Sequence, residues 1–141
     1  MAVIIAFCGH REVEDAAAVR TWLQDIFAAL LKEGATECWT GGKGAFSSCA
    51  ADVARQFPQL RSTLVKAYLS QDCDPKLYTD SLFPPLEDVP RRFAMHHRDR
   101  YMAQHADVLV MYVRHSFGNS MNLRDYALRQ GKRVICYPDL P

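Results

Sequence analysis

Two kinds of apolar pattern alternate along this chain. Short, continuous apolar runs rich in β-branched residues are typical of buried parallel strands. Between them, apolar residues recur every three or four positions, which is the period of an amphipathic helix. The predicted strands are residues 3–8, 37–39, 61–69, 108–112 and 133–136. The predicted helices are residues 19–31, 46–57, 90–105 and 121–130.

Strands that alternate with helices predict an α/β fold, because right-handed crossovers join parallel strands. We expect a single Rossmann-like domain over residues 1–141. It would be a three-layer sandwich in which helices cover both faces of a five-stranded parallel sheet of order 3-2-1-4-5. Residues 70–90 hold four prolines and no sustained period. We expect them to form a flap without regular structure over a binding site.

Three loops follow predicted strands at the edge of the sheet where ligands bind in folds of this kind. The second loop carries three glycines and a lysine just before a helix. Glycine allows close approach to the main chain, and the start of a helix attracts anions. The candidate ligand-binding or phosphate-binding residues of the three loops are Gly9, His10, Arg11, Gly41, Gly42, Lys43, Gly44, Ser116, Gly118, Asn119 and Ser120.

The glycine-rich loop matches neither standard nucleotide motif. It is one residue from GxGxxG, but it follows the second strand, and no acidic residue ends the third strand to bind a ribose. In the Walker motif a lysine follows the last glycine, whereas Lys43 precedes Gly44. The loop therefore predicts an anion site and identifies no cofactor, so none is assigned.

Arg98 lies on a mostly apolar face of its predicted helix, together with Ala94 and Met102. A buried arginine needs a partner, and its planar fork suits a carboxylate or a phosphate. Two interpretations stay open. Arg98 either binds an anionic ligand or pairs with an internal acid such as Asp107 or Asp125.

Composition narrows the choice of partners. The chain is 49% apolar and 23% charged, with a formal net charge of +1, which is ordinary for a globular protein. So small a net charge does not favour nucleic acid as a partner. The apolar N-terminal run has no basic region and is too short for a signal peptide or a membrane span.

The cysteines and histidines indicate the redox environment of the chain and whether it binds a metal. Five cysteines without a CxxC pair favour free thiols in a reducing cytoplasm. His96 and His97 are adjacent, so they point to different faces of their helix. Without a pair of ligands at helical spacing, no metal site is predicted.

Several motifs, in order along the chain, resemble the YpsA-like branch of the SLOG superfamily, which also contains the LOG and DprA proteins. They are residues 7–11, 41–46, 82–87, 92–94, 98–102, 115–118 and 126–127. The resemblance implies a Rossmann-like fold that binds a nucleotide or a nucleotide-derived ligand.

Within that superfamily, the LOG enzymes hydrolyse nucleoside monophosphates with an arginine and the segment PGGxGTxxE. Arg98 resembles the arginine, but the simplest match places Asn122 at the glutamate, and an asparagine cannot transfer a proton. Asp125 lies three residues further on. We therefore assign no catalytic residue, and Arg98 and Asp125 would act only in a hydrolase. Asn119 and Ser47 also depart from the YpsA-like pattern.

The preferred hypothesis is binding or sensing of a nucleotide-type small molecule at the carboxyl edge of the sheet. Arg98 would neutralise its phosphate, and His10 and Arg11 would line the far wall. One alternative is a LOG-like hydrolase that cleaves the N-glycosidic bond of a nucleoside monophosphate. Another is an interaction module with a vestigial pocket, and a homo-oligomer stays open.

Overall fold

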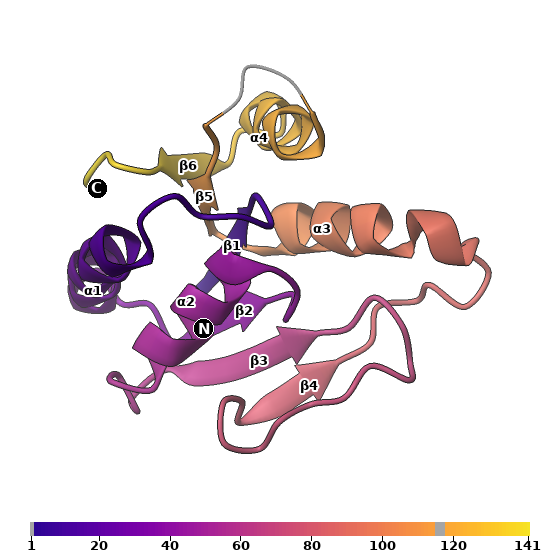
Figure 1. Ribbon diagram of the computed structural model, residues 1–141, viewed down its shortest axis with the longest axis horizontal. Helices are drawn as coiled ribbons and strands as arrows, with labels where there is room; N and C mark the ends of the chain where they lie inside the picture. Colours follow the sequence, from indigo (N-terminus) through magenta and orange to yellow (C-terminus); the bar gives the residue numbers. More distant parts are fainter. Residues whose placement is uncertain (1, 115–117) are drawn as a thin grey trace.

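One parallel sheet of six strands runs through residues 2–114 and 118–141, which this computed structural model describes (Figure 1). Its order is β4-β3-β2-β1-β5-β6, and every neighbouring pair is parallel. The strands are β1 (Ile4–Gly9), β2 (Glu37–Thr40), β3 (Arg61–Val65), β4 (Asp80–Leu82), β5 (Val108–Tyr112) and β6 (Arg133–Cys136).

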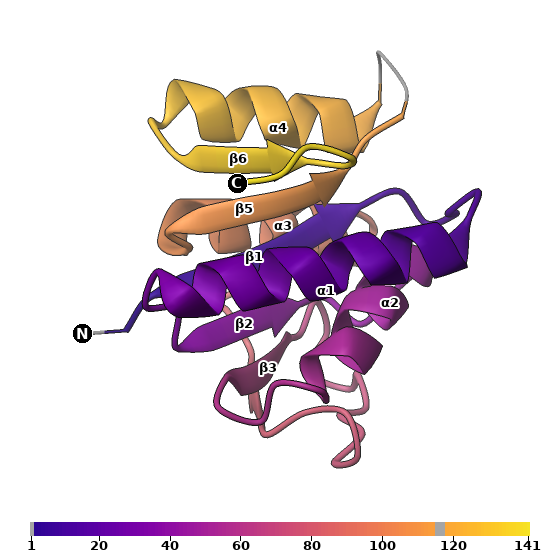
Figure 2. The same cartoon turned by 90° about the vertical axis from the view of Figure 1, so that its left-hand side faces the viewer.

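Helices cover both faces of the sheet, as predicted. They are α1 (Ala16–Lys32), α2 (Ala45–Ala54), α3 (Ala94–His105), which follows a 3-10 turn, and α4 (Asn119–Arg129). Figure 2 shows α1 and α2 in front of the sheet and α3 behind it. The sheet and the helices on its two faces form a three-layer, Rossmann-like arrangement. Within the described residues, no helix is long and apolar enough to cross a membrane.

The sheet has a separate core on each face, because its central strand is apolar on both sides. Along β1, Ile5 and Phe7 pack with α1 and α2, whereas Ala6 and Cys8 pack with α3 and α4. Successive side chains of a strand point to opposite faces, so a continuous apolar run suits this central position. In the first core, Phe27 stacks on Phe7 with ring centroids 4.8 Å apart.

The prediction of five strands is wrong, because a sixth strand lies within residues 70–90. Strand β4 pairs with β3 through three residues, from Thr63 opposite Asp80 to Val65 opposite Leu82. Hydrogen bonds flank the pairing, and Lys66 N–H donates to the Leu82 carbonyl at 2.8 Å. A three-residue edge strand is too short to show a period of two, and its sequence therefore gave no strand signal.

The other five strands keep the predicted neighbours, since β3-β2-β1-β5-β6 is the expected order 3-2-1-4-5. Strand β3 ends at Val65 rather than at residue 69. Residues 67–70 form bends and turns instead, so the predicted strand was four residues too long.

Candidate functional site

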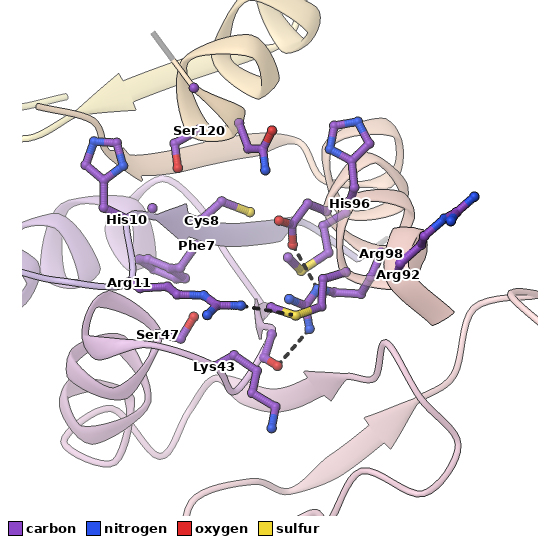
Figure 3. A pocket seen from close by; sticks show the side chains of 17 residues that line it. Phe7, Cys8, His10, Arg11, Lys43, Ser47, Arg92, His96, Arg98 and Ser120 are labelled. Atoms are coloured by element: carbon purple, nitrogen blue, oxygen red, sulfur yellow. Dashed lines mark hydrogen bonds and ion pairs between the residues drawn. The ribbon is translucent and has the colours of Figure 1, made fainter. Parts of the chain in front are cut away.

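A cavity of about 450 Å³ lies at the carboxyl edge of the sheet. Its walls are the end of β1 with the loop after it, the loop after β2, the first turn of α2, one face of α3 and the start of α4 (Figure 3). The helix after β1 covers one face of the sheet, and the helix after β5 covers the other. Ligands of open α/β sheets bind at such a switch point, and this volume suits a small ligand.

The three loops predicted from sequence meet at this cavity. Predicted residues that line it are Gly9, His10, Arg11, Gly41, Lys43, Arg98, Gly118, Asn119 and Ser120. Gly42 lines a neighbouring cavity of about 340 Å³ instead, and Gly44 lines neither. Ser116 lies outside the described residues. Among those that are described, no residue of the expected flap, 70–90, lines the cavity.

A backbone contact explains Gly44 in the loop at residues 41–44, the glycine loop. Gly44 has a φ of +89°, and a Cβ added there would lie 2.9 Å from Cα of Arg11. Beside this contact, Ala45 N–H donates to the Arg11 carbonyl at 2.7 Å. Only glycine adopts this conformation without strain and leaves room for the backbone of Arg11. The contact therefore holds the loops after β1 and β2 together.

Two helix starts at this cavity have no side-chain cap. α2 begins after Gly44 and α4 after Gly118, and neither helix has an acidic residue in its first turn. By contrast, Asp15 caps α1 by accepting a hydrogen bond from Ala18 N–H at 3.1 Å. Within the described residues, the amides of Phe46 and Ser47 donate no hydrogen bond. Such amides and the helix dipole favour an anion.

Cationic side chains surround the mouth of the cavity. Arg11, Lys43 and Arg92 are exposed and come from three different segments. Figure 3 shows Arg11 reaching from the loop after β1 toward α3, where its Nη2 contacts the Met95 sulfur at 3.8 Å. A negatively charged group of a ligand would be attracted to these side chains, even though the whole chain is nearly neutral.

His10, one of the candidate residues, lies on another wall of the cavity. Its Nε2 accepts a hydrogen bond from Arg114 N–H at 2.8 Å, and its ring meets Tyr112 edge-on, with centroids 6.0 Å apart. The predicted residue is therefore held by the backbone of the loop after β5.

Arg98 has internal partners. Its side chain is buried, with 3% exposure for the residue, and Nη1 donates to the carbonyls of Gly41 at 2.8 Å and Val65 at 3.3 Å. Its Nε donates to Oδ1 of Asp99 at 2.8 Å. Arg98 therefore joins α3 to the ends of β2 and β3. A Cβ on Gly41 would lie 2.5 Å from Cζ of Arg98, which is why the loop needs glycine there.

Internal pairing of Arg98 was one of the two expected alternatives, but its acidic partner was not foreseen. Asp107 accepts from Ile4 N–H at 2.8 Å, and Asp125 lies 3.6 Å from Arg124. Neither carboxylate lines the cavity, and Asn122 does not line it either. The residues proposed to replace the LOG glutamate are thus outside the cavity.

Asp99 is the one carboxylate among the described residues that line the cavity, and the sequence did not indicate it as a site residue. Its side chain is 34% exposed, and burial raises its pKa even though the charge of Arg98 opposes that shift. Adjacent residues of a helix do not share a face, so spacing gave no reason to pair Asp99 with Arg98. The available signal was an acid next to an inward-facing arginine. Other lining residues not assigned to the site beforehand are Phe7, Cys8, Ser47, Arg92, Met95, His96 and Met102.

Cys8 is not an activated thiol. It ends a buried strand, and burial raises its pKa well above its usual value. A nucleophilic thiolate needs the opposite shift. Across residues 2–114 and 118–141, no group of three or more His, Cys, Asp or Glu side chains is placed to hold a metal ion.

Comparison with solved structures identifies the fold. The molybdenum cofactor binding protein of the phototrophic bacterium Rippkaea orientalis aligns with a TM-score of 0.67 and 16% identity, over 96% of this chain and 76% of that one. The Moco carrier protein of Chlamydomonas reinhardtii gives 0.65 and 17% over the same shares. DNA processing protein A (DprA) of Streptococcus pneumoniae gives 0.70 and 16%, over 98% of this chain and 51% of that one.

The predicted Rossmann-like fold is confirmed. DprA is one of the proteins that the sequence resemblance had indicated. At these identities the likeness extends to the Rossmann-like fold alone, and the YpsA-like branch stays a prediction. A comparison with protein-family models finds no match, and neither does one with curated protein sequences.

Proposed function

We propose that this protein binds a phosphorylated, nucleotide-type small molecule in the cavity at the carboxyl edge of the sheet. One observation carries the proposal: two helix starts without side-chain caps face a cavity whose mouth has three cationic side chains. Backbone amides and mobile cations together form the usual protein environment of a phosphate. Ligand binding by structural neighbours supports the proposal, since two of them are named for binding or carrying the molybdenum cofactor.

Different walls of the cavity would contribute different groups to binding. The glycine loop and the start of α2 would hold the phosphate, with Lys43 and Arg11 neutralising its charge. Gly118, Asn119 and Ser120 would supply further amide and hydroxyl donors from α4. Arg98 would act by holding Gly41 in place, because its Nε and Nη1 already have protein partners.

Binding is proposed rather than hydrolysis. A LOG-like reaction uses the glutamate of the last motif, and neither Asn122 nor Asp125, the residues nearest its expected position, lines the cavity. The narrower expectations of a single domain, the YpsA-like branch and a cytoplasmic location accompany this proposal. The last of these is supported by five free cysteines.

Calorimetric titration tests the proposal with nucleoside monophosphates, nucleoside diphosphates and the molybdenum cofactor. That cofactor also joins a fused heterocycle to a phosphate. We expect at least one ligand to bind, Lys43→Ala to weaken its binding about tenfold, and added salt to weaken it further. Lys76→Ala is the matched control, because Lys76 is exposed and lines a different cavity. Equal binding by both variants, or no binding by any ligand, would refute the proposal.

A further inference from the structure

Asp99 is the one carboxylate among the described residues that line the cavity. Its negative charge would repel a phosphate placed beside it, so Asp99 is expected to face another part of the ligand. The pairing with Arg98 gives a hydrogen bond to one carboxylate oxygen only, since Nε donates to Oδ1. Within residues 2–114 and 118–141, Oδ2 accepts no hydrogen bond. This oxygen is therefore available to a further partner, since the Asp99 side chain is 34% exposed and lines the cavity.

The surroundings of Asp99 restrict what that partner can be. Arg98 and His96 are the charged or titratable groups that act on its carboxylate electrostatically, and the Cys8 thiol lies close enough to feel its charge. Arg98 already balances the negative charge of Asp99. With Arg11, Lys43 and Arg92 around the same cavity, a ligand ammonium group would be repelled. A neutral O–H or N–H donor meets no such penalty.

We infer that Asp99 determines ligand specificity, with its Oδ2 accepting a hydrogen bond from a neutral donor group of the bound ligand. In a nucleotide this donor is either a sugar hydroxyl or an N–H group of the base. The inference rests on the proposed function, and it concerns the sugar or the base of the ligand rather than its phosphate. A ligand without the donor leaves Oδ2 desolvated and unpaired, which lowers affinity about 10-fold to 100-fold.

Matched ligand pairs separate the two sources of the donor. The sugar arm compares AMP with dAMP and GMP with dGMP, which differ by one hydroxyl. The base arm compares GMP with IMP, which lacks the exocyclic amine. In calorimetric titrations of the whole chain, we expect the donor-bearing member of at least one arm to bind about 10-fold to 100-fold more tightly.

The matched variant is Asp99→Asn, which keeps an oxygen for Arg98 Nε and replaces Oδ2 by an amide that donates. We expect it to bind both members of the discriminating pair within about twofold. Asp125→Asn is the control, because Asp125 does not line the cavity, and it should retain the wild-type preference. Circular dichroism establishes that each variant is folded. If Asp99→Asn does not fold, the wild-type preference alone decides.

The outcomes separate this inference from the proposal on which it rests. Equal binding of both members in every pair, or an unchanged preference in Asp99→Asn, overturns the role of Asp99 and leaves nucleotide binding intact. Failure of all five nucleotides to bind the wild-type protein overturns the inference, and the titrations with diphosphates and the molybdenum cofactor then decide the proposed function.

Discussion

Removing the side chain of Arg98 should destabilise the fold more than it changes the charge of the site. The Arg98→Ala variant leaves the carbonyls of Gly41 and Val65 without their donor and leaves Asp99 without its cation. Hydrogen bonds to a charged group contribute about 1.5–3 kcal/mol each, and deleting one member of a buried ion pair costs about 3–5 kcal/mol.

These contributions share one side chain, so they do not add. We expect Arg98→Ala to lower the free energy of unfolding by about 3–5 kcal/mol, a large part of the roughly 5–15 kcal/mol typical of a domain. For a chain of this length, that loss lowers Tm by about 10 °C. Urea unfolding followed by circular dichroism gives the free energy, and calorimetry gives Tm.

Two further variants isolate the contact between Arg98 and Gly41. Arg100→Ala is the control on the same helix, since Arg100 is exposed and lies 4.5 Å from the Tyr126 ring centroid, and it should cost no more than about 1 kcal/mol. Gly41→Ala should resemble Arg98→Ala, because the new Cβ would lie 2.5 Å from the guanidinium carbon. In the Arg98→Ala background, the same Gly41→Ala change should be tolerated, which gives a large coupling in a double-mutant cycle.

An Arg98→Ala variant that is as stable as Arg100→Ala but has lost ligand binding would contradict the supporting role of Arg98. Arg98 would then contact the ligand rather than support the glycine loop. Additive effects of Gly41→Ala and Arg98→Ala would also contradict it, because the two residues would not act through one contact.

Three further predictions concern backbone, thiol and carboxylate chemistry. Gly44→Ala should destabilise the chain more than Gly34→Ala in urea unfolding, since both glycines have positive φ but only Gly44 faces a backbone atom within 3 Å. Burial raises the pKa of Cys38 to about 11, so iodoacetamide at about pH 8.5 should alkylate the half-buried Cys73 and spare Cys38, as mass spectrometry would record. Burial raises the pKa of Asp99 above 3.8, so the folded state binds its proton more tightly than the unfolded chain does. The free energy of unfolding should therefore fall as pH rises from about 4 through that raised pKa, and Asp99→Asn should lose this fall.

The sequence predicted the elements whose signals are local. Continuous apolar runs identified β1, β5 and β6, because a strand buried on both faces needs them. The meeting of the three loops followed from topology, since parallel strands bring their carboxyl ends to one edge. Gly9 and Lys43 could be placed at the cavity for that reason.

The missed features depend on contacts that no local pattern encodes. Strand β4 has three residues and forms only because β3 offers it an edge. The pairing of Arg98 with Asp99 joins adjacent residues of α3, whereas helical spacing separates adjacent side chains by about 100°. Whether Arg98 would meet a ligand or the protein was an open choice, because both interpretations need the same inward-facing position.

The hydrogen bonds of Arg98 also make the glycine loop depend on a segment made much later. Arg98 lies 57 residues after Gly41 and 33 after Val65. During synthesis, the loop and α2 emerge well before α3. The Gly41 carbonyl therefore lacks its Arg98 donor until α3 docks on the sheet. Contacts of such long sequence separation form late in folding. A ligand that requires the completed loop would then bind only the fully assembled chain and would stabilise the docked position of α3 by mass action.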